Sequence, residues 1–193
     1  MNKVSVIVPV FGCDQTLRVL AQRVLRTFEA QIEDIELILV DDGNSGETWK
    51  IIRGLASDYE WIRGIRLSRN FGQHPAIMAG IRSARGDSLV ILDCDLQDPV
   101  EEIPNFLEAL SNNEVVISLR VRDSVSRMRS FQAKMYVRFL KLLTGVTIDS
   151  RAGGIVAMTR KVANEYAQFR EPDHHLLYAL NWLGFATSYI ETK

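Results

Sequence analysis

The sequence predicts an α/β fold, with a mainly parallel central sheet covered by helices on both faces of a single domain. Three observations lead to this prediction. β-branched runs typical of buried strands alternate with segments of helical apolar spacing through residues 4–119. Strands separated by helices are joined by crossovers, which place neighbouring strands parallel. The chain has 193 residues, which suits one domain with a sizeable core.

The first two strand–helix pairs fall between residues 4 and 56. The run VSVIVPV (4–10) predicts a buried strand, and Asp14 is placed to cap the helix that follows. The run IELILV (35–40) predicts a second strand, closed by a turn at 41–43, and a short helix is expected over 48–56. The first helix carries one apolar stripe: Leu17, Leu20, Val24, Leu25 and Phe28.

Three more strands are predicted, at 61–67, 88–93 and 114–119. Pro75 marks the start of the helix between the first two, since proline favours the first helical turn. The next helix is expected to begin at Asp98–Pro99, with Glu101 three residues after Asp98 as in a capping box. Polar residues directly follow four of the strands. Ligands of such sheets gather at the carboxyl ends of the strands, so we expect a site at that edge.

Composition excludes several classes of protein. The formal net charge is −1, so no overall positive field attracts nucleic acid. Cys13 and Cys94 lack metal-site spacing and are interpreted as free thiols in a reducing compartment. We expect no signal peptide in KVSVIVPV, and no apolar stretch reaches the roughly 18 residues that a membrane-spanning helix needs.

The stretch VILDCDLQDP (90–99) carries the strongest functional signal. In an extended backbone Asp93 and Asp95 project to the same side, while Cys94 points away. Two neighbouring carboxylates repel each other unless a cation lies between them, and a hard divalent ion such as Mg²⁺ or Mn²⁺ meets that need. Gln97 is near enough in sequence to add an amide oxygen, whereas Asp98 is interpreted as a helix cap. Loop-end acids that face solvent are the alternative.

A second acidic pair, Asp41 and Asp42, ends the predicted strand at 35–40. One interpretation is an Asp-Gly turn completed by Gly43. The other is a carboxylate that accepts hydrogen bonds from a nucleobase or ribose at the sheet edge. The pattern of residues favours neither.

Three blocks of the sequence carry a family resemblance: VSVIVPVF, ELILVDDGNSGET and LSRNFGQHPAIMAGIRSARGDSLVILDCDLQDPVEEIPNF. They resemble the family 2 glycosyltransferases of GT-A fold. The chain is most similar to the branch of dolichyl-phosphate mannose synthase and its bacterial polyprenyl-phosphate relatives. The resemblance covers nearly the whole chain. It implies a GT-A Rossmann-like domain with a nucleotide-sugar binding half at 1–119 and an acceptor-side half at 120–193.

The resemblance also implies roles for individual residues. The donor is expected to be a UDP- or GDP-sugar, with Pro9 and Phe11 bordering its base. Asp42, with Asp41 beside it, is expected to meet the nucleoside. The residues that shape the adjoining loop are Arg69, Asn70 and Gly72.

The same resemblance implies that Asp93, Asp95 and Gln97 hold Mg²⁺ or Mn²⁺ and the diphosphate. The chain departs from the family at 153–156, where it reads Gly-Gly-Ile-Val and relatives often have Gly-Asp-Phe-Arg. The implied reaction is displacement at the anomeric carbon, with a nucleoside diphosphate as the leaving group. The sugar is therefore transferred with inversion.

A general base is needed for one class of acceptor and not for another. A lipid phosphate is already an anionic nucleophile, whereas a glycan hydroxyl must lose a proton. Asp149 and Asp173 are the candidate catalytic bases. Asp173 has a second interpretation, as the cap of a helix containing His174 and His175, a pair expected at the surface.

Basic residues follow the strand at 114–119. Arg120 and Arg122 are candidates to bind the donor diphosphate or the acceptor phosphate. Residues 128–142 combine a helical apolar stripe with Lys134, Arg138 and Lys141. Such a helix packs on a sheet or, less commonly, lies on an anionic membrane surface. We expect a cytoplasmic protein that is peripheral on the cytosolic membrane face.

The leading hypothesis is a metal-dependent hexosyltransferase that acts on polyprenyl phosphate in cell-surface glycan synthesis. A glycosyltransferase that acts on a glycan hydroxyl is one alternative. A non-catalytic nucleotide-sugar binding module is the other. Nucleic acid is not expected as a partner, and a homodimer stays open as the assembly.

Overall fold

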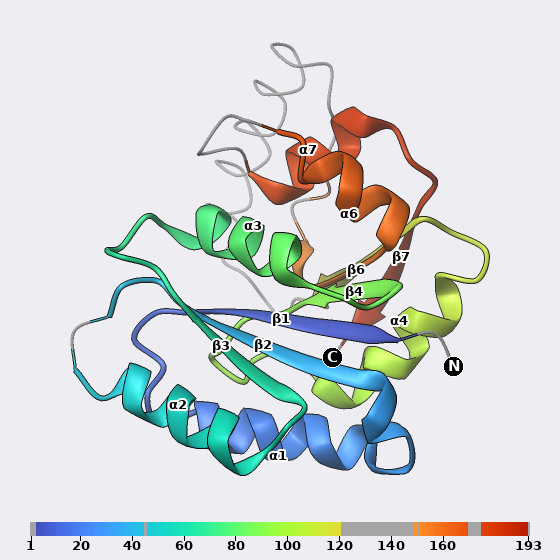
Figure 1. Cartoon of the computed structure of the whole chain (residues 1–193). Helices are drawn as coiled ribbons and strands as arrows, with labels where there is room; N and C mark the ends of the chain where they lie inside the picture. Colours follow the sequence, from blue (N-terminus) through green and yellow to red (C-terminus); the bar gives the residue numbers. More distant parts are fainter. Residues whose placement is uncertain (1–2, 45, 121–148, 150, 170–174, 193) are drawn as a thin grey trace, which may run out of the picture.

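The centre of the computed structural model is a sheet with strand order β3-β2-β1-β4-β6-β5-β7 (Figure 1). The structure describes residues 3–44, 46–120, 149, 151–169 and 175–192. β1 pairs in parallel with β2 and β4, and β2 pairs in parallel with β3. The five predicted strands are confirmed: β1 (Val4–Val10), β2 (Ile35–Asp41), β3 (Ile62–Arg66), β4 (Ser88–Ile91) and β5 (Val115–Arg120).

Two strands were not predicted. β6 (Ala152–Thr159) lies antiparallel between β4 and β5, and β7 (Thr187–Thr192) runs parallel to β5 at the edge of the sheet. Gly153 and Gly154 at the start of β6 weaken its strand pattern, since glycine is depleted in strands. Because β5 and β4 each run antiparallel to β6, β5 ends at the same edge as β1, β2 and β4.

Helices cover both faces of the sheet, as predicted (Figure 1). Alternate residues of β1 explain this, since Val4, Val6, Val8 and Val10 pack on one face and Ile7 on the other. Among the described residues, no helix has the length and apolar character needed to cross a membrane. Residues 128–142 lie outside the described part of the chain. The first face carries α1 (Leu17–Thr27), α2 (Thr48–Asp58), η2 (Val100–Glu102) and α4 (Ile103–Ala109), and the second carries α3 (Gln73–Ser83), α6 (Arg160–Tyr166) and α7 (Leu176–Leu183). The short helix η1 (Glu29–Asp34) connects α1 to β2.

Two of the predicted helix caps are wrong. Asp14 does not cap α1, whose N-cap residue is Thr16; its carboxylate accepts a hydrogen bond from the hydroxyl of Thr48 in α2. Asp98 does not cap the helix after it, where Pro99 holds the N-cap position without a side-chain bond. In both places the carboxylate that the local pattern predicted at a helix N-terminus accepts a hydrogen bond from a residue distant in sequence.

A buried carboxylate lies at the edge of the sheet opposite the carboxyl ends of the parallel strands. Glu36 is 4 % exposed, and it accepts hydrogen bonds from the hydroxyl of Ser5 (2.6 Å), the backbone N–H of Arg85 (2.5 Å) and the guanidinium of Arg63 (3.0 Å). Burial raises the pKa of Glu36, but these hydrogen bonds outweigh it, so the pKa lies below its ordinary value. The network therefore favours the charged carboxylate.

Candidate functional site

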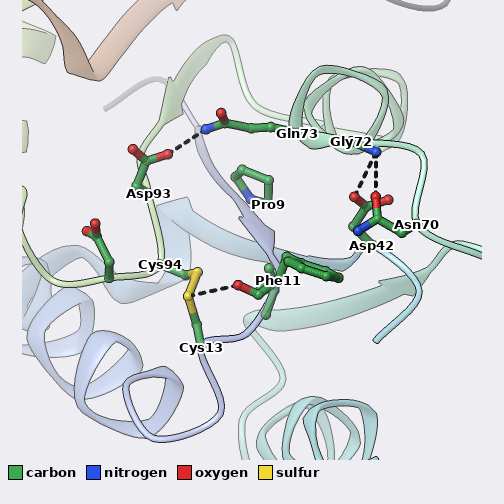
Figure 2. A pocket seen from close by; sticks show the side chains of 11 residues that line it. Pro9, Phe11, Cys13, Asp42, Asn70, Gly72, Gln73, Asp93 and Cys94 are labelled. Atoms are coloured by element: carbon green, nitrogen blue, oxygen red, sulfur yellow. Dashed lines mark hydrogen bonds between the residues drawn. A yellow bond between two sulfur atoms is a disulfide. The ribbon is translucent and has the colours of Figure 1, made fainter. Parts of the chain in front are cut away.

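A pocket of about 350 Å³, here called the first pocket, lies where β1, β2 and β4 end. Its residues come from the end of β1, from the segments after β1, β2, β3 and β4, and from the start of α3. The sequence predicted a site at this edge, and the edge holds a pocket. The lining residues are Pro9, Val10, Phe11, Cys13, Asp42, Asn70, Gly72, Gln73, Asp93, Cys94 and Asp95 (Figure 2).

The acidic pair after β2 has two separate roles. Asp42 lines the first pocket, and its carboxylate accepts bonds from the backbone N–H groups of Phe71 (2.8 Å) and Gly72 (2.9 Å). Asp41 is fully buried, and its Oδ1 accepts bonds from the backbone and side-chain amides of Asn44. Asp41 thus holds the turn after β2, while Asp42 ties that turn to the loop before α3.

Glycine is required at the point where these two loops meet. Gly43 has φ +69°, and a Cβ there would collide with the backbone of Arg69. The side chain of Arg69 lies over the ring of Phe71, 4.0 Å from its centroid, and outside the first pocket. Phe11 is 59 % exposed at the pocket and offers a flat apolar surface of the kind on which nucleobases stack.

Asp93 lies at the centre of the site. Its Oδ1 accepts a bond from the side-chain amide of Gln73 (2.7 Å; Figure 2). Its Oδ2 lies 3.9 Å from the guanidinium of Arg120. Burial raises the pKa of Asp93 above its ordinary value, and the neighbouring charges of Asp98 and Asp95 add to this; Arg120 and Gln73 offset only part of it. The carboxylates therefore create a local excess of negative charge.

Asp98 anchors the strand ends around Asp93. It is 4 % exposed, receives a bond from Arg120 (3.1 Å) and accepts a longer one from the backbone N–H of Asp93 (3.4 Å). Gly154 packs against it with φ +80°, where a Cβ would overlap the Asp98 carboxylate and lie 3.1 Å from the hydroxyl of Ser118. Asp98 was expected at a helix terminus and is instead the link between β4, β5 and β6.

A second pocket, of about 240 Å³, lies on the other side of Asp93. Asp93 and Gln73 line both pockets. The ring of His175 lies 4.6 Å from that of His74, between centroids, and Nδ1 of His74 accepts a bond from the backbone N–H of Leu176. That bond leaves the proton of the neutral His74 ring on Nε2, so the ring is a hydrogen-bond donor. The second pocket is lined by Gln73, His74, Ile77, Ile91, Asp93, Arg120, Ala152, Gly153, Gly154, Val156, His175, Leu176 and Leu177.

The structure separates the other predicted site residues. Gln97 does not line either pocket; its backbone N–H donates to Asp95 Oδ1 (3.0 Å), in a turn where Leu96 has φ +64°. Asp149 is bound by Arg151 at 2.9 Å, and this side-chain bond lowers the pKa of Asp149 below its ordinary value. Arg122 and Asp173 lie outside the described residues.

Several residues of the site were not predicted from the sequence. Gln73 and His74 stand beside Pro75, which was used only as a helix signal, and His175 was expected at the surface without a role. His175 is indeed exposed, yet it borders the second pocket. Polar residues just before a predicted helix, following a strand, were the signal that was available for Gln73 and His74.

The prediction of free thiols is wrong. Cys13 and Cys94 form a disulfide, with their Cα atoms 6.0 Å apart and a sequence separation of 81 (Figure 2). Spacing excluded a metal site but could not reveal that the segments after β1 and β4 meet. Pairing of adjacent parallel strands brings these two segments together.

The residues around Asp93 suit a hard divalent cation. Burial is the main cause of the raised pKa of Asp93, and the charges of Asp98 and Asp95 add to it; a bound cation would favour the charged carboxylate. No cluster of three or more His, Cys, Asp or Glu side chains suited to a metal occurs among the described residues. Two carboxylates are nevertheless enough for Mg²⁺ where substrate phosphates supply further oxygens.

Comparison with known sequences identifies a family. Residues 5–177 match the model of glycosyl transferase family 2. The chain is 34 % identical over 185 residues to an undecaprenyl-phosphate 4-deoxy-4-formamido-L-arabinose transferase of Shewanella sediminis, covering 95 % of this chain and 55 % of that protein. It is 28 % identical over 191 residues to a prophage bactoprenol glucosyl transferase homolog of Escherichia coli K12, covering 98 % and 62 %. The chain thus spans little more than half the length of these relatives.

Solved structures share the fold. The mannosyltransferase PcManGT from Pyrobaculum calidifontis, in complex with GDP-Man and Mn²⁺, superposes with a TM-score of 0.69 at 18 % identity, covering 98 % of this chain and 55 % of that one. Staphylococcus aureus TarS (residues 1–349) in complex with UDP superposes with a TM-score of 0.67 at 14 % identity, covering 99 % and 58 %. The predicted GT-A fold is confirmed.

Proposed function

This chain belongs to glycosyl transferase family 2, and from that premise we propose that it transfers a sugar from a nucleoside diphosphate sugar to a polyprenyl phosphate. The two relatives described above are named for sugar transfer to undecaprenyl phosphate and bactoprenol. One structural observation carries the proposal: Asp93 and Gln73 line two pockets at once. A donor in one pocket and an acceptor in the other meet at that boundary.

The first pocket suits the donor. Phe11 is positioned to stack on the base, and the backbone around Asp42 and Gly72 frames the nucleoside. Asp93 and Asp95 would hold Mg²⁺ or Mn²⁺ together with oxygens of the diphosphate. When bound, the cation neutralises charge that develops on the departing diphosphate. Gln97, which is outside the pocket, contributes through its backbone bond to Asp95.

The second pocket suits an anionic acceptor. Arg120 brings a positive charge beside Asp93, and His74 is a hydrogen-bond donor by virtue of its bond from Leu176. The positive charge of Arg120 favours a phosphate over a neutral hydroxyl. A phosphate acceptor also needs no general base, so the low pKa of Asp149, which makes it a weak base, does not count against the reaction.

The division of the chain into two halves fits the two pockets. Every residue lining the first pocket falls within 9–95, while the second pocket adds residues from 120–177. We propose that 1–119 binds the donor and that 120–193 contributes most of the acceptor side. Because a polyprenyl phosphate resides in a membrane, we also propose peripheral attachment at the cytosolic face.

The test is product formation from labelled donors. The full chain is incubated with radiolabelled UDP- or GDP-sugars, Mn²⁺ and polyprenyl phosphate in detergent micelles, and the lipid extract is resolved by chromatography. We expect label in the lipid phase with one donor, and its loss in Asp95→Asn. Asp58→Asn is the matched control, since it removes an exposed carboxylate at the end of α2, away from both pockets. Label transferred to an oligosaccharide and not to the lipid would favour the glycan-hydroxyl alternative. Binding of nucleotide without any product would favour the binding module.

A further inference from the structure

The disulfide joins two loops that line the first pocket. Cys13 follows β1, and Cys94 stands between Asp93 and Asp95 (Figure 2). Both cysteines line the pocket. Any movement of the Cys94 backbone therefore moves the two flanking carboxylates.

Other bonds between these loops are few in the described part of the chain. The hydroxyl of Thr16 lies 2.9 Å from the carbonyl oxygen of Cys13 and 2.6 Å from that of Cys94. A hydroxyl has a single hydrogen, so the two carbonyls share one donor. The covalent bond is consequently the stronger of the two connections at this point.

The two cysteines differ in exposure. Cys94 is 7 % exposed, whereas Cys13 is more exposed and its Sγ lies 3.5 Å from the carbonyl oxygen of Phe11 at the pocket rim. A thiolate from solvent can therefore approach Cys13 through the pocket. In the reduced protein the Cys13 thiol can donate a hydrogen bond to the Phe11 carbonyl, which gives the released sulfur a partner.

We propose that Cys13 and Cys94 are a thiol–disulfide exchange site that controls the metal and nucleotide affinity of the first pocket. A thiolate of a dithiol reductant attacks Sγ of Cys13, the S–S bond breaks, and Cys94 leaves as a thiolate that takes up a proton. The second thiol of the reductant attacks the mixed disulfide and releases Cys13, so two electrons pass from dithiol to protein. A small-molecule disulfide reverses the reaction.

The oxidised form is the one with higher affinity. The bond holds Asp93 and Asp95 in one arrangement, so less ordering accompanies the binding of the cation and the diphosphate. Reduction releases that constraint while the sheet and its helices stay in place. The effect on affinity rests on the proposed function, whereas the exchange chemistry does not.

Exchange is tested by equilibrating the folded protein in glutathione buffers of graded redox ratio, alkylating it and measuring its mass. We expect full, reversible conversion between a form with no alkylated cysteine and a form with both alkylated. A pair that stays oxidised in reducing buffers, or that never forms, would overturn the proposal. Amide hydrogen exchange of residues 93–97 gives a readout independent of any ligand. It should be slower in the oxidised protein, and equal rates would also count against the proposal.

The coupling to affinity is tested by calorimetry with GDP or UDP and Mn²⁺, on protein reduced and then freed of reductant. We expect reduction to weaken binding ~3- to 10-fold, as the cost of ordering one loop predicts. Cys13→Ser is the control for the reducing treatment. This variant has no disulfide, so its affinity for nucleotide should be the same before and after the treatment. Equal affinity of the oxidised and reduced wild type would refute the coupling. If no nucleotide binds to either the oxidised or the reduced protein, the proposed function fails. The alkylation mass measurement and amide hydrogen exchange then still test whether Cys13 and Cys94 form a thiol–disulfide exchange site.

Discussion

Gly154→Ala tests whether Asp98 positions the centre of the site. The substitution places a Cβ against the Asp98 carboxylate at a backbone φ of +80°. A non-glycine residue in that left-handed region costs ~1–2 kcal/mol. Displacement of a buried carboxylate from its partners Arg120 and the Asp93 N–H costs a further ~1–3 kcal/mol. We therefore expect the free energy of unfolding to fall by ~2–5 kcal/mol.

The neighbouring Gly153→Ala supplies the control. Gly153 also has a positive φ, +151°, but a Cβ there meets nothing within 4 Å. Urea unfolding of both variants separates backbone strain from the contact with Asp98, and kcat/KM for lipid acceptor reports the position of Arg120. Equal stability and equal kcat/KM in the two variants would refute the role assigned to Asp98.

Three further outcomes are expected. Glu36→Gln should lower the free energy of unfolding by ~1–3 kcal/mol at pH 7. Because the pKa of Glu36 is depressed, its stabilising effect is present above the ordinary value of 4.5 and is lost as the pH falls through the lowered pKa. A difference between variant and wild type that stays constant in urea unfolding down to pH 3 would contradict this. Asp93 has a raised pKa, so its negative charge opposes folding once the pH exceeds that pKa. Asp93→Asn should therefore raise the thermal unfolding midpoint at pH 7 in the absence of metal, and it should abolish Mn²⁺ binding. A lowered thermal midpoint would argue against an excess of negative charge at this site. Phe11→Ala should weaken nucleotide binding in calorimetry by ~1–3 kcal/mol if the ring stacks on the base, whereas Phe11→Tyr should bind normally; equal affinity of the alanine variant would remove that role.

The first half of the fold could be predicted from local pattern alone. β1, β2 and β4 are buried on both faces by helices, so their sequences are continuous apolar runs that stand out from the helical segments between them. β6 and β7 could not be found in this way. β6 has two glycines directly after its first residue and pairs antiparallel inside the sheet, and β7 is an edge strand whose burial alternates. Neither has the pattern of the parallel core.

The donor side of the site was also accessible from sequence, because its residues directly follow predicted strands. Asp42 and Asp93 were both singled out, and both line the first pocket. On the acceptor side Arg120 was singled out as a candidate to bind phosphate, whereas His74 and His175 were not, since the second pocket brings them together from separate segments. Which carboxylates serve as caps could not be predicted either: Asp98 matches a capping pattern, yet its partner Arg120 lies on another strand.

By itself, the sequence determined the parallel α/β core, the edge of the sheet that holds the site and the acidic residues placed there. These follow from spacing along the chain, which determines where strands and helices alternate and the side to which neighbouring side chains project. Only the tertiary structure decided that Cys13 bonds to Cys94, that Asp98 joins three strands and that Asp93 stands between two pockets. Each of these depends on contacts between residues far apart in sequence, which no local pattern encodes.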